Sequence, residues 1–240
     1  MASATAQLMR TGDSHSITVT TLDSFAAQWL VPRLKDFRAR FPEIDVRILP
    51  PDDVVDFNRH EVDLAIRYGA GKWPGLVVRQ LMTEELFPVC SPSLFQGARP
   101  LRRPEDLVHH TLLHDDLSFE NGDVDWLTWL RTVGADNVVD SRRGPFFSHS
   151  YLVLQAAIDG QGVALGRGVL VAEAMADGRL VQPFDLAGIP LEYAYYVAHP
   201  EGAVHRPAVA AFGNWLIKEA RRSQENSNVE YTALIEKYQT

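Results

Sequence analysis

Two stretches of the chain share one order of elements: a strand pattern, then hydroxyl residues, then an apolar helix face. In residues 16–22 the side chains alternate with a period of two, and Phe25, Trp29 and Phe37 then follow at helical spacing. The same order returns at residues 146–159, where Ser148 and Ser150 precede the helix pattern. Period two is typical of a strand and a spacing of three or four is typical of a helix. The pattern therefore predicts two similar α/β lobes.

The remaining segments alternate in the same way. The 240 residues suffice for two lobes of about 100 residues each. Because strands alternate with helices, we predict mainly parallel sheets. Pro32 falls inside the first helix pattern and predicts a kink or a restart there. Further strands are predicted at 44–48, 62–68, 76–78, 86–90, 163–165, 180–184 and 191–198, and further helices at 103–108, 125–133, 169–176 and 205–222.

Charge and composition limit the partners of this chain. The net charge of −8 repels phosphate backbones, so we do not expect the chain itself to bind nucleic acid. A single cysteine, Cys90, forms no intrachain disulfide, which fits a reducing compartment. The sequence has neither an apolar run long enough to cross a membrane nor a secretory signal pattern. We therefore expect a cytoplasmic protein with no membrane partner.

The best candidate ligand-binding residues lie where strands give way to helices. Ligands of α/β sheets bind beyond the carboxyl ends of strands, and helix starts favour negative charge. Two helix starts that carry hydroxyls would hold an anionic ligand, but serine at such a position commonly only caps its helix. Both interpretations are open for these residues, which are Thr20, Thr21, Asp23 and Ser24 in the first lobe and Ser148, His149 and Ser150 in the second.

Other candidates also have two interpretations. Arg67 ends a predicted strand, where its guanidinium would clamp a carboxylate or form a salt bridge with Asp63 or Asp56. Trp73 in the following loop would line a cleft or fix the loop. Tyr193 and Tyr195 share one face of a strand, opposite Tyr196, and one face is expected to be core. The hydroxyls on the other face would reach a ligand.

Catalytic and metal sites have little support in the sequence. Cys90 lies in an apolar run, which is typical of inert packing. Ser148-His149-Ser150 does not form a nucleophile elbow. The histidines at 109, 110 and 114 match no zinc spacing, and the pair Asp115-Asp116 reads as solvated. Gly166-Arg167-Gly168 is a weak candidate for a phosphate loop. We therefore expect no enzyme activity, no cofactor and no metal.

Taken in order, the motifs of residues 15–220 resemble the effector-binding (substrate-binding) domain of LysR-type transcription regulators. They look most similar to the branch that contains the glycine-cleavage activator and the β-lactamase regulator. The motifs are Phe25 with Leu30-Val31-Pro32-Arg33-Leu34, Phe37 and Phe41-Pro42; residues 62–69 (VDLAIRYG) and 71–76 (GKWPGL); 86–92 (LFPVCSP); 111–114 (TLLH); Trp126 with Trp129-Leu130; Gln155-Ala156-Ala157 with Gly160 and 162–166 (GVALG); and 180–184 (LVQPF).

The resemblance implies a periplasmic-binding-protein-like fold, with two Rossmann-like lobes joined by two crossing strands. It places lobe I at 15–88 plus 198–220 and lobe II at 90–196, with a polar tail at 223–240. Residues 1–14 resemble the end of the linker helix that follows a winged helix-turn-helix head, so DNA would be bound only through that head.

Matching the motifs of the β-lactamase regulator, which resemble this sequence, implies ligand contacts at Ser24, at His149 or Ser150, and at Tyr193, in a cleft between the lobes. Asp63 falls at a position tied to switching between inactive and active states. The resemblance also implies a homodimer or tetramer. The sequence departs from the β-lactamase regulator at 114–125 and 134–147, so the identity of the ligand is not carried over.

These observations favour a cytoplasmic bacterial sensor of a small, anionic metabolite or peptide. The alternatives are a solute-binding protein of a transport system and a small hydrolase.

Overall fold

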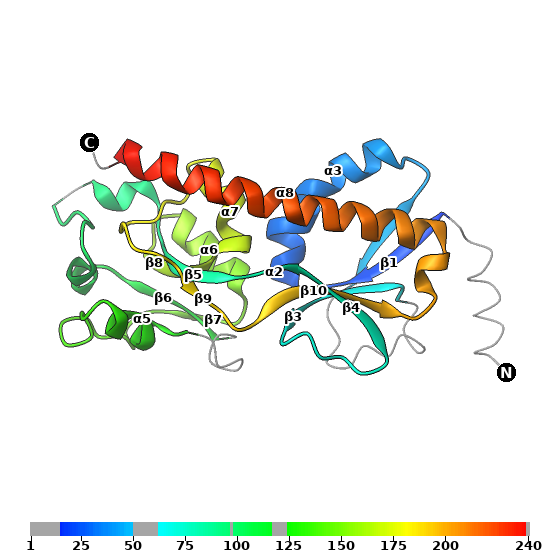
Figure 1. Ribbon diagram of the computed structural model, residues 1–240. Helices are drawn as coiled ribbons and strands as arrows, with labels where there is room; N and C mark the ends of the chain where they lie inside the picture. The colour runs from blue at the N-terminus through cyan, green and yellow to red at the C-terminus, as the bar shows by residue number, and fades with distance from the viewer. Residues whose placement is uncertain (1–14, 50–61, 97, 117–123, 239–240) are drawn as a thin grey trace. The chain divides into compact units, whose positions relative to one another are not determined.

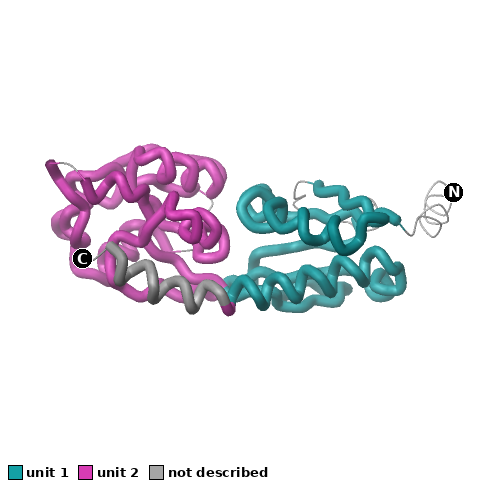
Figure 2. The backbone as a smooth tube through the Cα atoms, turned by 90° about the horizontal axis from the view of Figure 1, so that it is seen from above, with its two compact units in different colours: residues 1–83, 193–224 teal, residues 84–192, 225–240 magenta. Residues whose placement is uncertain are grey.

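The chain folds into two compact units, each built on its own sheet. The computed structural model describes residues 15–49, 62–96, 98–116 and 124–238, with side chains only as far as Glu225. The expected linker-helix remnant at 1–14 lies outside these residues. Unit 1 comprises residues 1–83 and 193–224, and unit 2 comprises residues 84–192 and 225–240 (Figure 2). The chain therefore passes from unit 1 to unit 2 after Thr83 and returns after Glu192.

The sheet of unit 1 has five strands and mixed pairing. Its order is β2-β1-β3-β10-β4. β1 pairs in parallel with β2 and β3, whereas β10 pairs antiparallel with both β3 and β4. The strands are β1 (Ser16–Thr20), β2 (Asp45–Leu49), β3 (Leu64–Gly69), β4 (Leu76–Met82) and β10 (Ala194–Pro200) (Figure 1).

The sheet of unit 2 has the same kind of mixed pairing. Its order is β7-β6-β8-β5-β9. β6 pairs in parallel with β7 and β8, and β5 pairs antiparallel with β8 and β9. The strands are β5 (Glu85–Val89), β6 (Leu112–Asp115), β7 (Phe146–Phe147), β8 (Val163–Arg167) and β9 (Ile189–Pro190).

Two sequence predictions about the sheets need correction. The sheets are mixed rather than mainly parallel, because the strands that follow the two passages between units, β5 and β10, run antiparallel to their neighbours. The predicted strand at 180–184 is wrong, since only the single bridge between Cys90 and Val181 forms. Pro183 has no backbone N–H with which to extend that bridge into a ladder.

The first helical segment of unit 1 changes type at Pro32. Helix α2 (Asp23–Phe25) continues into a π-helical stretch (Ala26–Leu30) and then into α3 (Val31–Arg40). The N–H of Val31 donates to the carbonyl of Ala26, five residues back. The proline, which lacks a donor, then sits in the first turn of α3. The predicted restart of the helix at Pro32 is therefore confirmed, and it takes the form of a π segment.

The C-terminal helix α8 (Pro207–Tyr238) packs on α3 in unit 1 (Figure 1). The ring of Phe37 lies 5.1 Å from the rings of both Phe212 and Trp215. The indole N–H of Trp215 donates to Asp36 over 3.0 Å, and this bond is the main cause that lowers the pKa of that carboxyl. The helix runs past the predicted end at residue 222, because residues 223–238 contain neither glycine nor proline.

The core of unit 2 gathers around two tryptophans of α5 (Trp126–Thr132). The rings of Trp126 and Trp129 meet edge to face at 5.7 Å, and Trp129 stacks on Phe184 at 5.8 Å. Both tryptophans are 2% exposed, and the indole N–H of Trp126 donates to the carbonyl of Leu113 in β6 over 3.0 Å. This bond ties α5 to the strand that ends at the candidate site. The other helices of the unit are α6 (Ser150–Ile158) and α7 (Gly168–Ala176).

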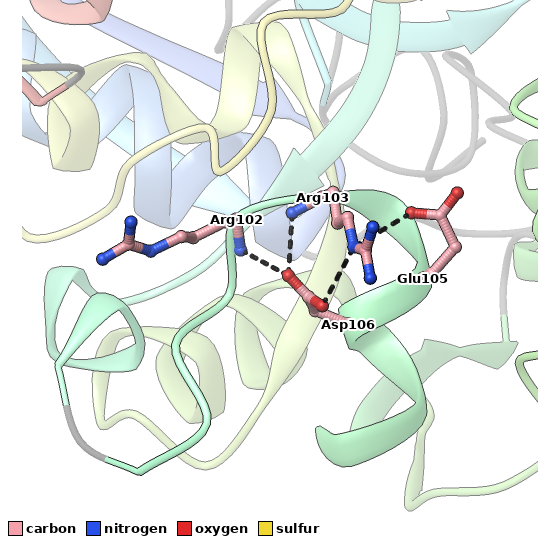
Figure 3. A network of polar contacts seen from close by, with 4 residues as sticks. All are labelled: Arg102, Arg103, Glu105 and Asp106. Atoms are coloured by element: carbon pink, nitrogen blue, oxygen red, sulfur yellow. Dashed lines mark hydrogen bonds and ion pairs between the residues drawn. The ribbon is translucent and has the colours of Figure 1, made fainter.

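One carboxylate organises the short 3-10 helix at Pro104–His109 in unit 2. Asp106 accepts the backbone N–H groups of Arg102 and Arg103 over 3.0 Å each (Figure 3). The guanidinium of Arg103 reaches back to Asp106 at 3.5 Å and to Glu105 at 3.8 Å (Figure 3). Asp106 therefore closes the first turn, which explains why the predicted helix at 103–108 forms despite its short length.

A buried polar clip holds the first strand of unit 1 to two later segments. Asp63, just before β3, is 6% exposed and accepts the N–H of Thr18 over 2.9 Å. Its own N–H donates to the carbonyl of Thr18 over 2.9 Å, and its carboxylate pairs with Arg206. Arg206 also donates to the carbonyl of Ser16 over 2.9 Å. The Asp63–Arg206 clip thus joins β1, β3 and the approach to α8.

We expect Asp63→Ala to lower the free energy of unfolding by about 3 kcal/mol, because it removes the buried acceptor shared by Thr18 and Arg206. Urea denaturation of this variant, of Arg206→Ala and of the double variant measures the coupling. We expect the double variant to lose little more than Asp63→Ala alone. Losses that simply add would show that the two side chains act independently, and would contradict the clip.

Candidate functional site

The helix that follows β1 starts without a side-chain cap. Its N-cap residue is Leu22, in an extended conformation, and the side chain of Leu22 makes no cap hydrogen bond. Ser24 lies inside the helix and is 7% exposed, so capping is not its role. Uncapped N–H groups at a helix start favour an anion. Asp23, also a predicted ligand residue, is exposed in that first turn.

Thr21 presents a buried hydroxyl next to this helix start. The residue is 1% exposed, and its Oγ1 has no hydrogen-bond partner among the described residues. Its backbone N–H is used, because it donates to the carbonyl of Leu49 over 3.3 Å. Thr20, the last residue of β1, is also buried at 2% exposure. A buried hydroxyl without a partner costs about 1–3 kcal/mol, which a bound ligand would recover.

The equivalent position in unit 2 is the start of α6. His149 is the N-cap residue there and makes no side-chain cap bond. Ser150 is the first helical residue, and its hydroxyl donates to Asp115 at the end of β6 over 2.5 Å. Ser148 Oγ lies 2.8 Å from His149 Nδ1. Ser150, like Ser24, therefore does not serve merely as a helix cap.

Asp115 is a site residue that sequence reasoning missed. It was expected to be solvated together with Asp116, but it is half-buried and bonded to Ser150. It also lines a pocket within unit 2, together with His114, Asp125, Trp126 and Leu165. The partner of Asp115 lies 35 residues away in the sequence. The only available signal was its place at the carboxyl end of a strand.

In unit 1, Tyr193 belongs to an aromatic cluster that reaches the helix start. Its ring meets Tyr68 edge to face at 5.7 Å, and Tyr68 lies 5.1 Å from Tyr195. Tyr195, which is 1% exposed, packs 4.8 Å from Phe25, the residue after Ser24. Tyr193 lies just before β10, which begins at Ala194, so it does not share a strand face with Tyr195 as predicted. Both rings nevertheless contact Tyr68, and Tyr195 is part of the core.

The remaining candidates lie within β3, in the loop that follows it and just before it. Arg67 is half-buried within β3, opposite Tyr196 on β10, and does not end its strand. Trp73 meets Tyr196 edge to face at 5.7 Å and packs on Gly69, so it fixes its loop. Asp63 lies before β3 in the Asp63–Arg206 clip, away from the carboxyl end of β1.

The positions of Cys90 and His114 do not support a catalytic site. Cys90 is fully buried, and burial raises the pKa of its thiol to about 12, so the reactive thiolate does not form near neutral pH. His114 stacks on Phe146 at 4.2 Å, and burial lowers the pKa of its imidazole. Within the described ranges, no group of three or more histidine, cysteine or carboxylate side chains is placed to hold a metal.

The predicted weak phosphate loop at Gly166–Gly168 is ruled out by its neighbours. The start of α7 is already occupied by a carboxyl of the chain itself, because Glu84 accepts the N–H of Val169 over 3.1 Å. A side chain at Gly166 would collide with Val171 and Val89, so this glycine serves close packing.

Comparison with known proteins agrees with the fold and the sequence motifs. Residues 10–221 match the family described as the LysR substrate binding domain. The glycine cleavage system transcriptional activator of Escherichia coli K12 is 44% identical over 228 residues, which cover 95% of this chain and 72% of that protein. The transcriptional activator AmpR of Citrobacter koseri is 32% identical over 204 residues, which cover 85% of this chain and 67% of that protein.

Solved structures give the same answer. The AmpR effector binding domain of Citrobacter freundii is 28% identical and superposes with a TM-score of 0.68, covering 87% of this chain and 99% of that one. The AmpR effector domain of Pseudomonas aeruginosa is 30% identical with a TM-score of 0.66, covering 92% of this chain and 99% of that one. The predicted two-lobed, periplasmic-binding-protein-like fold is therefore confirmed.

No helix within the described residues is long and apolar enough to cross a membrane. The relatives named above are transcription regulators rather than transport proteins or enzymes. The family match, the relatives and the fold lead to one conclusion: the chain belongs to the LysR family of transcription regulators and is its effector-binding domain.

Proposed function

We propose that this domain senses a small, anionic metabolite or peptide, held by the helix starts at residues 21–24 and 148–150. Thr21, Asp23 and Ser24 with Arg67 and Tyr193 would contact it from unit 1, and Ser148, His149 and Ser150 from unit 2. The observation that carries the proposal is the buried, unpartnered hydroxyl of Thr21 beside an uncapped helix start. The positive end of the helix dipole gives this position an affinity for an anion.

The two helix starts offer different chemistry to the ligand. In unit 1 the Thr21 hydroxyl, which has no partner among the described residues, and the positive end of the helix dipole suit a carboxylate or phosphate. In unit 2 the hydroxyl of Ser150 donates its hydrogen bond to Asp115. The lone pairs of Ser150 Oγ can then accept a hydrogen bond from a donor on the ligand. An effector that carries both an acid and an N–H or O–H group would satisfy both. Amino acids, hydroxy acids and peptides have this combination.

Strand β1 connects the proposed site to the Asp63–Arg206 clip. Thr18 bonds to Asp63, and Thr21 comes three residues later along the same segment. A shift of this segment upon binding would act directly on the clip, which supports the proposed switching role of Asp63. The effector must bind two states of the domain with different affinity, because equal affinity would shift nothing.

The domain would pass this shift to DNA through partners. We propose a homodimer or tetramer in which a winged helix-turn-helix head, outside this sequence, reads the DNA. The net charge of −8 agrees with a domain that does not bind DNA itself. Neither a cofactor nor a membrane enters this scheme.

We expect Thr21→Val to weaken effector binding about 10-fold or more, the loss associated with one hydrogen bond to a charged group. Folding stability should stay the same or rise, because the variant removes an unsatisfied buried hydroxyl. Calorimetry with amino acids, organic acids and short peptides first finds a binder for the unmodified chain. Unchanged affinity in Thr21→Val would remove unit 1 from the site.

Ser150→Ala tests the contribution of unit 2. It removes the hydroxyl bonded to Asp115, so we expect weaker binding together with a stability loss of about 1 kcal/mol. Ser93→Ala is the matched control, since Ser93 is exposed and its hydroxyl bonds to the hydroxyl of nearby Ser91. Thermal shifts induced by the same binder measure both variants. An equal response from Ser150→Ala and Ser93→Ala would contradict a two-unit site.

A further inference from the structure

A buried carboxyl marks the point where the chain enters unit 2. Glu84 is 4% exposed and is the first residue after the passage from unit 1. Its backbone carbonyl accepts the N–H of Leu191 over 2.9 Å. Leu191 lies just before the return passage, which follows Glu192. One residue thus joins the incoming and the outgoing connecting segments.

The side chain of Glu84 fastens this junction to α7. Its Oε1 accepts the N–H of Val169 over 3.1 Å and the N–H of Glu85 over 3.0 Å. The N-cap residue of α7, Arg167, makes no side-chain cap bond, and the helix begins at Gly168. Gly168 lies against this carboxyl, since a Cβ placed on it would be 3.4 Å from Oε1. The other oxygen, Oε2, is buried and has no partner among the described residues.

The charges around Glu84 oppose one another. Arg167 of β8, which is 6% exposed, and the two backbone N–H groups favour the ionised form. Glu85 of β5, which is half-buried, disfavours it, and the first turn of α7 adds no acidic group. Burial outweighs the stabilising partners and raises the pKa of Glu84 to about 8.

Neither protonation state of Glu84 is fully satisfied. The described residues offer Oε2 neither an acceptor for a proton nor a donor for the ionised form, and burial shields this oxygen from solvent. With the pKa raised to about 8, the two states lie close in free energy near neutral pH, so a modest change of pH exchanges one for the other.

We propose that Glu84 is a proton-binding group that fastens both connecting segments to the start of α7, and that loss of its proton loosens this junction. The proposal is independent of the effector site, because it concerns contacts within unit 2 that no effector residue makes.

The direction of the pH effect follows from the sign of the shift. The folded pKa of about 8 lies above the ordinary value of 4.5. The neutral carboxyl therefore stabilises the fold fully below pH 4.5, and this stability is lost as the pH rises to about 8. Above that pH the contribution is constant, since the group is ionised in both the folded and the unfolded chain.

The test compares Glu84→Gln with the unmodified full chain. Glutamine keeps an oxygen for the N–H groups of Val169 and Glu85 but does not titrate. We expect urea denaturation to show stability falling between pH 5 and pH 8 in the unmodified chain, and a clearly smaller fall in Glu84→Gln. Glu85, whose pKa burial also raises, is present in both proteins, so the difference between them isolates Glu84.

Glu192→Gln is the matched control, an exposed carboxyl on the outgoing segment, and should keep the unmodified profile. A local readout is amide exchange at Val169 and Leu191, which should lose protection above pH 8 in the unmodified chain and not in Glu84→Gln. If Glu84→Gln does not fold, the proposal is tested by a pH titration of the unmodified chain, in which carbon NMR follows the labelled carboxyl groups of the glutamates. A buried carboxyl that titrates near pH 8 supports the proposal. Identical pH profiles for the two proteins, or titration of every glutamate near 4.5, would overturn it.

Discussion

Buried polar groups need partners, and this requirement organises both units of the domain. Where it is met, it fixes the fold: Asp63 joins β1, β3 and the approach to α8, and Asp36 receives the indole of Trp215. Where it is not met, two of the exceptions among the described residues bear on function. Thr21 Oγ1 adjoins an uncapped helix start, and Glu84 Oε2 lies at the entry to unit 2. The proposed sensing and the proposed proton binding both rest on these exceptions.

The proposed site and the proposed switch share one strand. β1 is short, parallel to both of its neighbours, and buried at Ile17 and Val19. Because it is closely packed, we expect any displacement of β1 to involve the whole strand. Its carboxyl end leads into the helix start that would bind the effector, and its middle residue bonds to Asp63. This arrangement gives a physical route from ligand contact to the Asp63–Arg206 clip without a flexible loop in between.

The sequence predicted most elements because their signals are local. Alternation placed the strands, and the spacing of Phe25, Trp29 and Phe37 placed the first helix with its irregularity at Pro32. The mixed pairing of the sheets was not predictable, because it depends on how β5 and β10 enter their sheets. The strand at 180–184 fails for a local reason, since Pro183 cannot donate to a ladder.

The residues of interest, too, were only partly predictable from the sequence. Ser24 and Ser150 were found from their places between strand and helix, although neither is the helix cap that such a place suggests. Asp115 and Glu84 were missed because their roles come from distant partners, 35 and 85 residues along the chain. No short sequence pattern encodes burial of that kind.

The central claim is that an effector is held by the helix starts of both units. The most direct test is backbone NMR of the labelled chain, titrated with a small acid that calorimetry shows to bind. The account predicts that the largest amide shifts cluster at residues 22–25 and 149–151, with saturation at a common affinity. Shifts confined to one unit, or centred on surfaces away from both helix starts, would contradict it.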